Sequence, residues 1–166
     1  MGALDHLPPP LKRHRMTAAA YQQMGTAGVL PADLHVELID GEIIEMAPIG
    51  SRHWAMVNRL DELLRQTVSK HAIVSTQSSF RLDDFSEPQP DLALFRRRDD
   101  FYAGALPTPV DTLLVVEVAD SSARYDREVT LPLYARRGEV SATPTPGVVG
   151  IATLQGVAVD LTGLFG

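Results

Sequence analysis

The 166-residue chain contains no cysteine. This absence excludes disulfides and thiolate metal sites, and it is typical of an intracellular protein, so we expect a cytoplasmic location. The sequence also lacks an apolar run that approaches the roughly 20 residues needed to span a bilayer. Basic residues at 12, 13 and 15 are not followed by the apolar segment of a signal peptide. We therefore expect no membrane partner.

Positive charge is scarce as well. The chain has 15 Lys and Arg residues against 21 Asp and Glu residues, which gives a formal net charge of −6. This balance argues against a protein that coats nucleic acid nonspecifically. It does not exclude a nuclease, because a metal site requires acids and only one face of such an enzyme must be basic. Apolar residues make up 45% of the chain and charged residues 22%, as in an ordinary soluble globular domain.

Two apolar, strand-like stretches, residues 87–95 and 113–118, carry Asp91 and Glu117. An acid inside a strand that is buried on both faces is anomalous, because a buried, unpaired carboxylate is energetically costly. If the two strands are neighbours, Asp91 and Glu117 project toward one point, where their oxygens suit Mg²⁺ or Mn²⁺. The alternative is that each acid sits at a strand end and meets solvent or an arginine.

Hydrophobic periodicity and turn residues predict the order of the elements. A helix is expected over residues 16–24 with Thr17 as its N-cap, and a hairpin over residues 35–47 with a tight primed turn at Asp40-Gly41. Further helices are expected over 53–70 and 126–137, and strands over 72–76, 79–82, 148–153 and 155–161. This order indicates a mixed α+β fold of the α/β type, with a central mixed sheet flanked by helices and an N-terminal β-hairpin.

Two further polar residues are candidates for a site. Glu37 lies on the first strand of the hairpin, where an acid is usually part of a solvated face but here is a candidate for a functional role. His53 falls in the first turn of its helix, where a neutral imidazole could hydrogen-bond a phosphate or another substrate group. The alternative for His53 is an ordinary polar helix start.

Five sequence motifs occur together in a recognisable order. They are residues 37–46, His53 at a helix start, residues 90–93, residues 116–118, and residues 124–138. In this order they resemble the Uma-two family of restriction-type endonucleases, within the PD-(D/E)XK nuclease superfamily. The resemblance covers about residues 16–139.

The resemblance implies a restriction-endonuclease-like core and metal-dependent hydrolysis of phosphodiester bonds in DNA. It implies that Asp91 and Glu117 hold Mg²⁺ or Mn²⁺ and that Glu37 is the additional catalytic and metal-binding acid. It also implies a nuclease-like domain over residues 16–139, preceded by a flexible tail, 1–15, and followed by a divergent or truncated segment, 140–166. Nucleases of this fold that cut duplexes often pair, so a homodimer is expected.

The sequence departs from the family pattern at the catalytic lysine. The superfamily position falls at Ala119, and the position used in Uma-like proteins falls at Thr130. Threonine cannot supply a cation. Arg127 could reach the substrate, but a guanidinium is a poor proton acceptor. Two alternatives therefore stay open: an inactive relative that binds nucleic acid or a protein partner, and an acidic structural domain.

Overall fold

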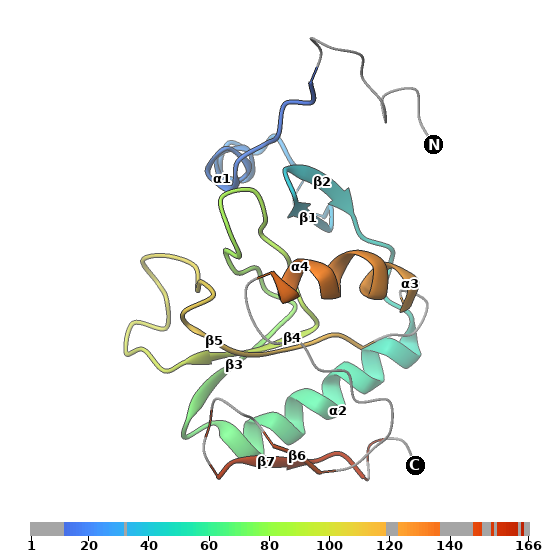
Figure 1. Ribbon diagram of the computed structural model, residues 1–166, viewed down its shortest axis with the longest axis vertical. Coiled ribbons are helices and arrows are strands. Elements are labelled where there is room, and N and C mark those ends of the chain that lie inside the picture. The colour runs from blue at the N-terminus through green and yellow to red at the C-terminus, as the bar shows by residue number, and fades with distance from the viewer. Residues whose placement is uncertain are drawn as a thin grey trace.

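A three-stranded sheet lies at the centre of the molecule. The computed structural model describes residues 12–31, 33–118, 123–136, 148–150, 154, 156–162 and 164. The central sheet has the order β3 (Ala72–Thr76), β4 (Leu92–Arg96), β5 (Thr112–Val116). Figure 1 shows α2 (Ser51–Val68) on one face of this sheet and, on the other, α3 (Ala123–Tyr125) and α4 (Leu131–Ala135), which the π-helical turn η1 (Asp126–Thr130) joins. The mixed α+β class with helices flanking a sheet is confirmed.

The two faces of β4 explain its unbroken apolar sequence. Leu92 and Leu94 pack in a core with α2, whereas Ala93 and Phe95 pack with residues of α4. Successive side chains of a strand point to opposite faces, so a strand covered on both sides reads as a continuous apolar run. The pairings of β3 with β4 and of β4 with β5 are antiparallel. In this respect the central sheet of the described chain differs from the mixed sheet that was expected.

The predicted hairpin is confirmed. It consists of β1 (Val36–Ile39) and β2 (Glu42–Glu45), paired antiparallel. Asp40 and Gly41 have φ values of 50° and 85°, as a tight primed turn requires. A Cβ atom on Gly41 would lie 2.6 Å from the Cβ of Arg15, so both the turn and the close approach of the preceding chain require glycine here.

The helices before and after the hairpin also follow their sequence signals. α1 (Ala18–Thr26) is capped by Thr17, whose hydroxyl accepts a hydrogen bond from the backbone N–H of Ala20 at 3.2 Å. α2 buries a stripe at helical spacing, which consists of Val57, Leu60, Leu64 and Val68. This stripe packs against residues of all three strands in the core beneath the central sheet.

The prediction of a strand over residues 79–82 is wrong. Phe80 and Leu82 are buried, but the backbone of this segment bonds to loops: the N–H of Phe80 donates to Pro88 and that of Arg81 to Pro107. Alternating burial therefore arises here from an extended connection that is covered by other loops, because burial requires packing and not a regular ladder.

Two short strands lie near the C-terminus. β6 (Val148–Gly150) and β7 (Ala158–Asp160) pair antiparallel, within the two stretches predicted as strands. Val159 and Leu164 are buried in the core that α2 shares with the central sheet. The helices in the described part of the chain include none that is both long and apolar enough to cross a membrane.

Candidate active site

Asp91 and Glu117 lie side by side at one end of the central sheet. Asp91 directly precedes β4 and Glu117 directly follows β5. In the antiparallel register Leu92 pairs with Val116, so the residues just beyond that pair meet at the same edge. The expectation that the acids lie within strands is therefore wrong, because each flanks its strand. The expectation that they converge is met, since antiparallel pairing joins the start of β4 to the end of β5.

Hydrogen bonds tie each acid to the backbone at or beside the other acid. The N–H of Asp91 donates to Oε2 of Glu117 at 3.2 Å, and the N–H of Val118 donates to Oδ2 of Asp91 at 2.9 Å. The other oxygen of Asp91, Oδ1, lies 2.8 Å from Nε2 of His53 in the first turn of α2. Only 14% of the Asp91 side chain and 16% of the His53 side chain are exposed. Such bonds fix the direction of the carboxylates before any ligand binds.

In the segment that leads into β4, prolines alternate with Glu87, Gln89 and Asp91, whose backbone N–H groups are hydrogen-bonded. Its prolines, Pro88 and Pro90, are fully buried and have no N–H to satisfy. Each of the other N–H groups has a partner: Glu87 donates to the carbonyl of Leu38, Gln89 to the Glu37 carboxylate at 3.1 Å, and Asp91 to Glu117. The alternation of proline with hydrogen-bonded residues thus holds this connection straight and aligns it with both the hairpin and β5.

Two tyrosines from the α3–α4 region complete the acidic cluster. The hydroxyl of Tyr125 donates to Oε1 of Glu37 at 3.0 Å, and the hydroxyl of Tyr134 donates to Oε1 of Glu117 at 2.8 Å. Glu37 is buried on β1. Burial, together with the charges of Glu117 and Glu37, raises the pKa of Tyr134 far above its usual range. Tyr134 is therefore a permanent hydrogen-bond donor to the site.

Sequence reasoning assigned no role to Tyr125, Tyr134 or Gln89. Both tyrosines belong to the stretch 124–138 that contributed to the family resemblance, and Gln89 stands between the two prolines. Membership of these stretches was the only signal available, because a phenol or an amide finds its carboxylate partner through the tertiary fold.

The other residues singled out in the sequence lie in different surroundings. His53 bonds to Asp91, so its Nε2 atom faces the acid and not open solvent. The side chain of Arg127 lies outside the described residues, although its backbone belongs to η1. Thr130, where a lysine was expected, is buried with 6% exposure. It stands one helical turn before Tyr134, so the two share a face of the helical segment.

The acids of this site meet some of the needs of a divalent metal. Within the described ranges there is no group of three or more His, Asp or Glu side chains arranged to hold an ion. Asp91 and Glu117 nevertheless provide adjacent hard oxygens, and each Asp91 oxygen accepts one of the hydrogen bonds above, which leaves it capacity for a further partner. Mg²⁺ characteristically binds through one or two carboxylates, with water and substrate phosphate as its other ligands. The pair thus fits such an ion, and Glu37 lies on the hairpin, where it bonds to Gln89 and Tyr125.

The chain is similar to a known protein family. The profile of the Uma2 family, described as "Putative restriction endonuclease", matches residues 18–140. This match covers most of the chain and includes each of the acids and tyrosines described above. No curated protein matches the chain.

Proposed function

The chain belongs to the Uma2 family, and we propose that it hydrolyses phosphodiester bonds in DNA with Mg²⁺ or Mn²⁺ held by Asp91 and Glu117. The observation that carries this proposal is the antiparallel pairing that sets these acids side by side. The proposal assigns this activity to residues 16–139, with residues 1–15 as a tail and 140–166 as a divergent segment. We also propose that the protein is cytoplasmic and that it forms a homodimer, which places one active site on each DNA strand.

The residues of the site are the acids and the groups that orient them. Asp91 and Glu117 are the proposed metal ligands, and a bound ion would lower the pKa of water and polarise the scissile phosphate. The N–H of Val118 orients Asp91, and the hydroxyl of Tyr134 orients Glu117. Glu37 is the proposed additional acid: it lies near enough to Tyr134 for its charge to raise the pKa of that phenol.

His53 and Arg127 are the proposed substrate-binding residues. His53 lies at the start of α2 and bonds to Asp91 through Nε2. A phosphate that approached Asp91 would therefore also approach the imidazole and the first turn of α2, where backbone N–H groups favour an anion. Arg127 is assigned from the family resemblance, and its guanidinium would balance negative charge on the phosphate.

A second candidate function follows from Thr130. The expected lysine would supply a cation for transition-state charge, and the buried threonine at this position cannot. The same acid pair and fold would then serve an inactive relative that binds nucleic acid or a protein partner. Strand scission distinguishes this function from the first.

The test is calorimetric titration of the purified chain with Mn²⁺, repeated on Glu117→Gln and on Asp99→Asn. Asp99 is exposed in the loop after β4 and provides a matched loss of one charge away from the site. We expect the parent and Asp99→Asn to bind one Mn²⁺ ion and Glu117→Gln to lose binding. Cleavage of plasmid DNA would follow the same pattern. Equal binding by Glu117→Gln and the parent would show that the metal site is assigned to the wrong residues.

A further inference from the structure

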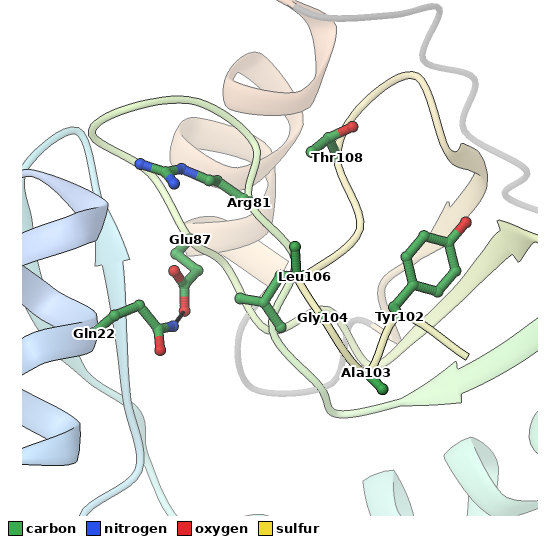
Figure 2. Close-up of a pocket in the computed structure, with 9 residues that line it drawn as sticks. Gln22, Arg81, Glu87, Tyr102, Ala103, Gly104, Leu106 and Thr108 are labelled. Carbon is green, nitrogen blue, oxygen red and sulfur yellow. Dashed lines mark hydrogen bonds between the residues drawn. The ribbon is translucent and has the colours of Figure 1, made fainter. Parts of the chain in front are cut away.

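A second acidic site lies on the same segment as Asp91, at a pocket of about 480 Å³. We call it the Glu87 pocket. Figure 2 shows Gln22, Arg81 and Glu87 on one side of it, and the loop of residues 102–108 on the other. Its volume is within the range of small-molecule sites, roughly 300–1,000 Å³.

Glu87 is an unusual residue for a pocket wall. Its side chain is 1% exposed, and its Oε1 atom accepts a hydrogen bond from the amide of Gln22. Its Oε2 atom is buried and has no hydrogen-bond partner within the described part of the chain. A buried polar atom without a partner costs free energy, about 1–3 kcal/mol on average in proteins. The cost is understandable if a ligand provides the missing donor.

Two other polar side chains of the pocket wall already have hydrogen-bond partners, whereas Arg81 has only a distant one. The hydroxyl of Tyr102 donates to the carbonyl of Arg96 at 2.8 Å, and that of Thr108 donates to Asp111 at 2.8 Å. The guanidinium of Arg81 lies 3.7 Å from Asp84, too far for a close hydrogen bond. The charged groups that the pocket offers a ligand are therefore an acceptor, Oε2 of Glu87, and a cationic donor, Arg81.

A ligand of this pocket must suit both Oε2 of Glu87 and the guanidinium of Arg81. Oε2 of a carboxylate accepts N–H groups, and Arg81 suits a phosphate. Guanine has two adjacent N–H donors, N1–H and the 2-amino group, on one edge. Thymine has a single N–H between two carbonyl oxygens, which a carboxylate would repel. The remaining wall, which includes Ala103 and Leu106, is apolar and suits the face of a base.

The pocket is also close to the acids of the proposed active site. Glu87 and Asp91 are four residues apart in one straightened segment, which spans at most about 14 Å. The backbone of Glu87 pairs with Leu38 of β1, next to Glu37. A nucleotide in the pocket would thus lie within a few nucleotide steps of the phosphate at Asp91.

We infer that the Glu87 pocket binds a guanine nucleotide of the substrate strand, with the base edge on Oε2 of Glu87 and a phosphate on Arg81. This inference rests on the proposed function, since it takes the ligand to be part of the nucleic acid that the acids cleave. It makes Glu87 and Arg81 determinants of sequence preference, separate from the residues that hold the metal.

The test is calorimetric titration of the full chain with dGMP, dIMP and dTMP in EDTA, which removes divalent metal from the acids. The nucleotide dIMP is the matched ligand, because it differs from dGMP only by the 2-amino group. We expect dGMP to bind about tenfold more tightly than dIMP, the change that corresponds to one hydrogen bond with a charged group, and dTMP to bind more weakly still.

Three variants assign the binding to the pocket. Glu87→Gln keeps the size of the side chain and should abolish the preference for dGMP over dTMP. Arg81→Ala should weaken both nucleotides by the same factor. Glu117→Gln should leave nucleotide binding unchanged while it removes cleavage. Circular dichroism of each variant verifies the fold, and the comparison of ligands on the parent needs no variant.

The outcomes separate this inference from the proposed function. Equal binding of the three nucleotides to the parent, no binding, or a preference that survives in Glu87→Gln would overturn the guanine site. A preference for dGMP together with no DNA cleavage would support the pocket and contradict the nuclease activity. Cleavage that depends on Glu117 without any nucleotide preference would do the reverse.

Discussion

Two acidic regions lie on one segment of this protein and differ in how their carboxylates are bonded. At the end of the central sheet and on the neighbouring hairpin, the oxygens of Asp91, Glu117 and Glu37 receive hydrogen bonds from backbone N–H groups, His53 and two tyrosines. At the Glu87 pocket, one oxygen of the carboxylate is buried without a donor in the described chain.

The difference indicates two ways of preparing a site. The Asp91 region is preorganised, because several hydrogen-bond donors hold its acids in place before any ligand binds. The Glu87 region is incomplete without a ligand, and burial raises the pKa of Glu87 in spite of the amide of Gln22 and the nearby charge of Arg81. Changes at the first region should therefore reduce function, whereas changes at the second should alter stability and preference.

The largest effect is expected from Asp91→Ala. Removal of this carboxylate takes away a proposed metal ligand, so Mn²⁺ binding should be abolished and cleavage should fall by more than about a hundredfold. The fold should remain, because the central sheet and its two cores do not depend on the Asp91 side chain. Calorimetry and a plasmid cleavage assay measure the two effects, with Asp99→Ala as the control. Retained Mn²⁺ binding would show that the region is not a metal site.

A smaller loss is expected from Tyr134→Phe. The change removes the hydrogen bond that orients Glu117 and keeps the aromatic ring, which packs near Phe80. Loss of a residue that orients a metal ligand typically costs about 10–100-fold in metal affinity. Mn²⁺ titration measures this loss. Tyr102→Phe, which removes a buried hydroxyl from a different region, should leave the affinity unchanged.

A gain is expected from Thr130→Lys. Thr130 shares a helical face with Tyr134, which bonds to Glu117, so the long lysine side chain should bring an ammonium toward the acids. Cleavage should then rise by about tenfold if the missing cation limits the reaction. Thr130→Met is the control for side-chain size. Equal cleavage by the two variants would show that the missing cation does not limit the cleavage rate.

The smallest effect is expected from Glu87→Gln, and it concerns stability. Since burial raises the pKa of Glu87 in the folded state, its contribution to stability is fully present below the unfolded pKa, about 4.3. That contribution is lost as the pH rises through the folded pKa. Glutamine stays neutral, so the variant should gain about 1 kcal/mol over the parent in the free energy of unfolding at pH 8.

Urea unfolding at pH 4 and pH 8 measures this gain. The gain in the free energy of unfolding should increase with pH for Glu87→Gln. It should not do so for the control Glu45→Gln, which changes an exposed acid on β2. A loss of stability in Glu87→Gln at pH 8 would mean that the carboxylate has a partner in the folded protein, and it would remove the argument for a ligand.

The sequence was sufficient for features that local chemistry controls. The primed turn at Asp40-Gly41, the cap at Thr17 and the buried stripe of α2 were predicted because each depends on neighbours a few residues away. The strand expected over residues 79–82 shows the limit of such patterns. Alternating apolar residues predict alternating burial, and they do not specify whether a strand or a loop lies alongside.

The sequence by itself thus determined the hairpin, the helix of residues 51–68 and the two apolar strands, each near an acid. The tertiary structure decided the rest. Antiparallel pairing brought Asp91 to Glu117, Tyr134 reached Glu117 from 17 residues away, and Tyr125 reached Glu37 across 88 residues. The fold also left Oε2 of Glu87 buried without a donor. Contacts of this kind depend on how distant segments pack, and no local pattern records that packing.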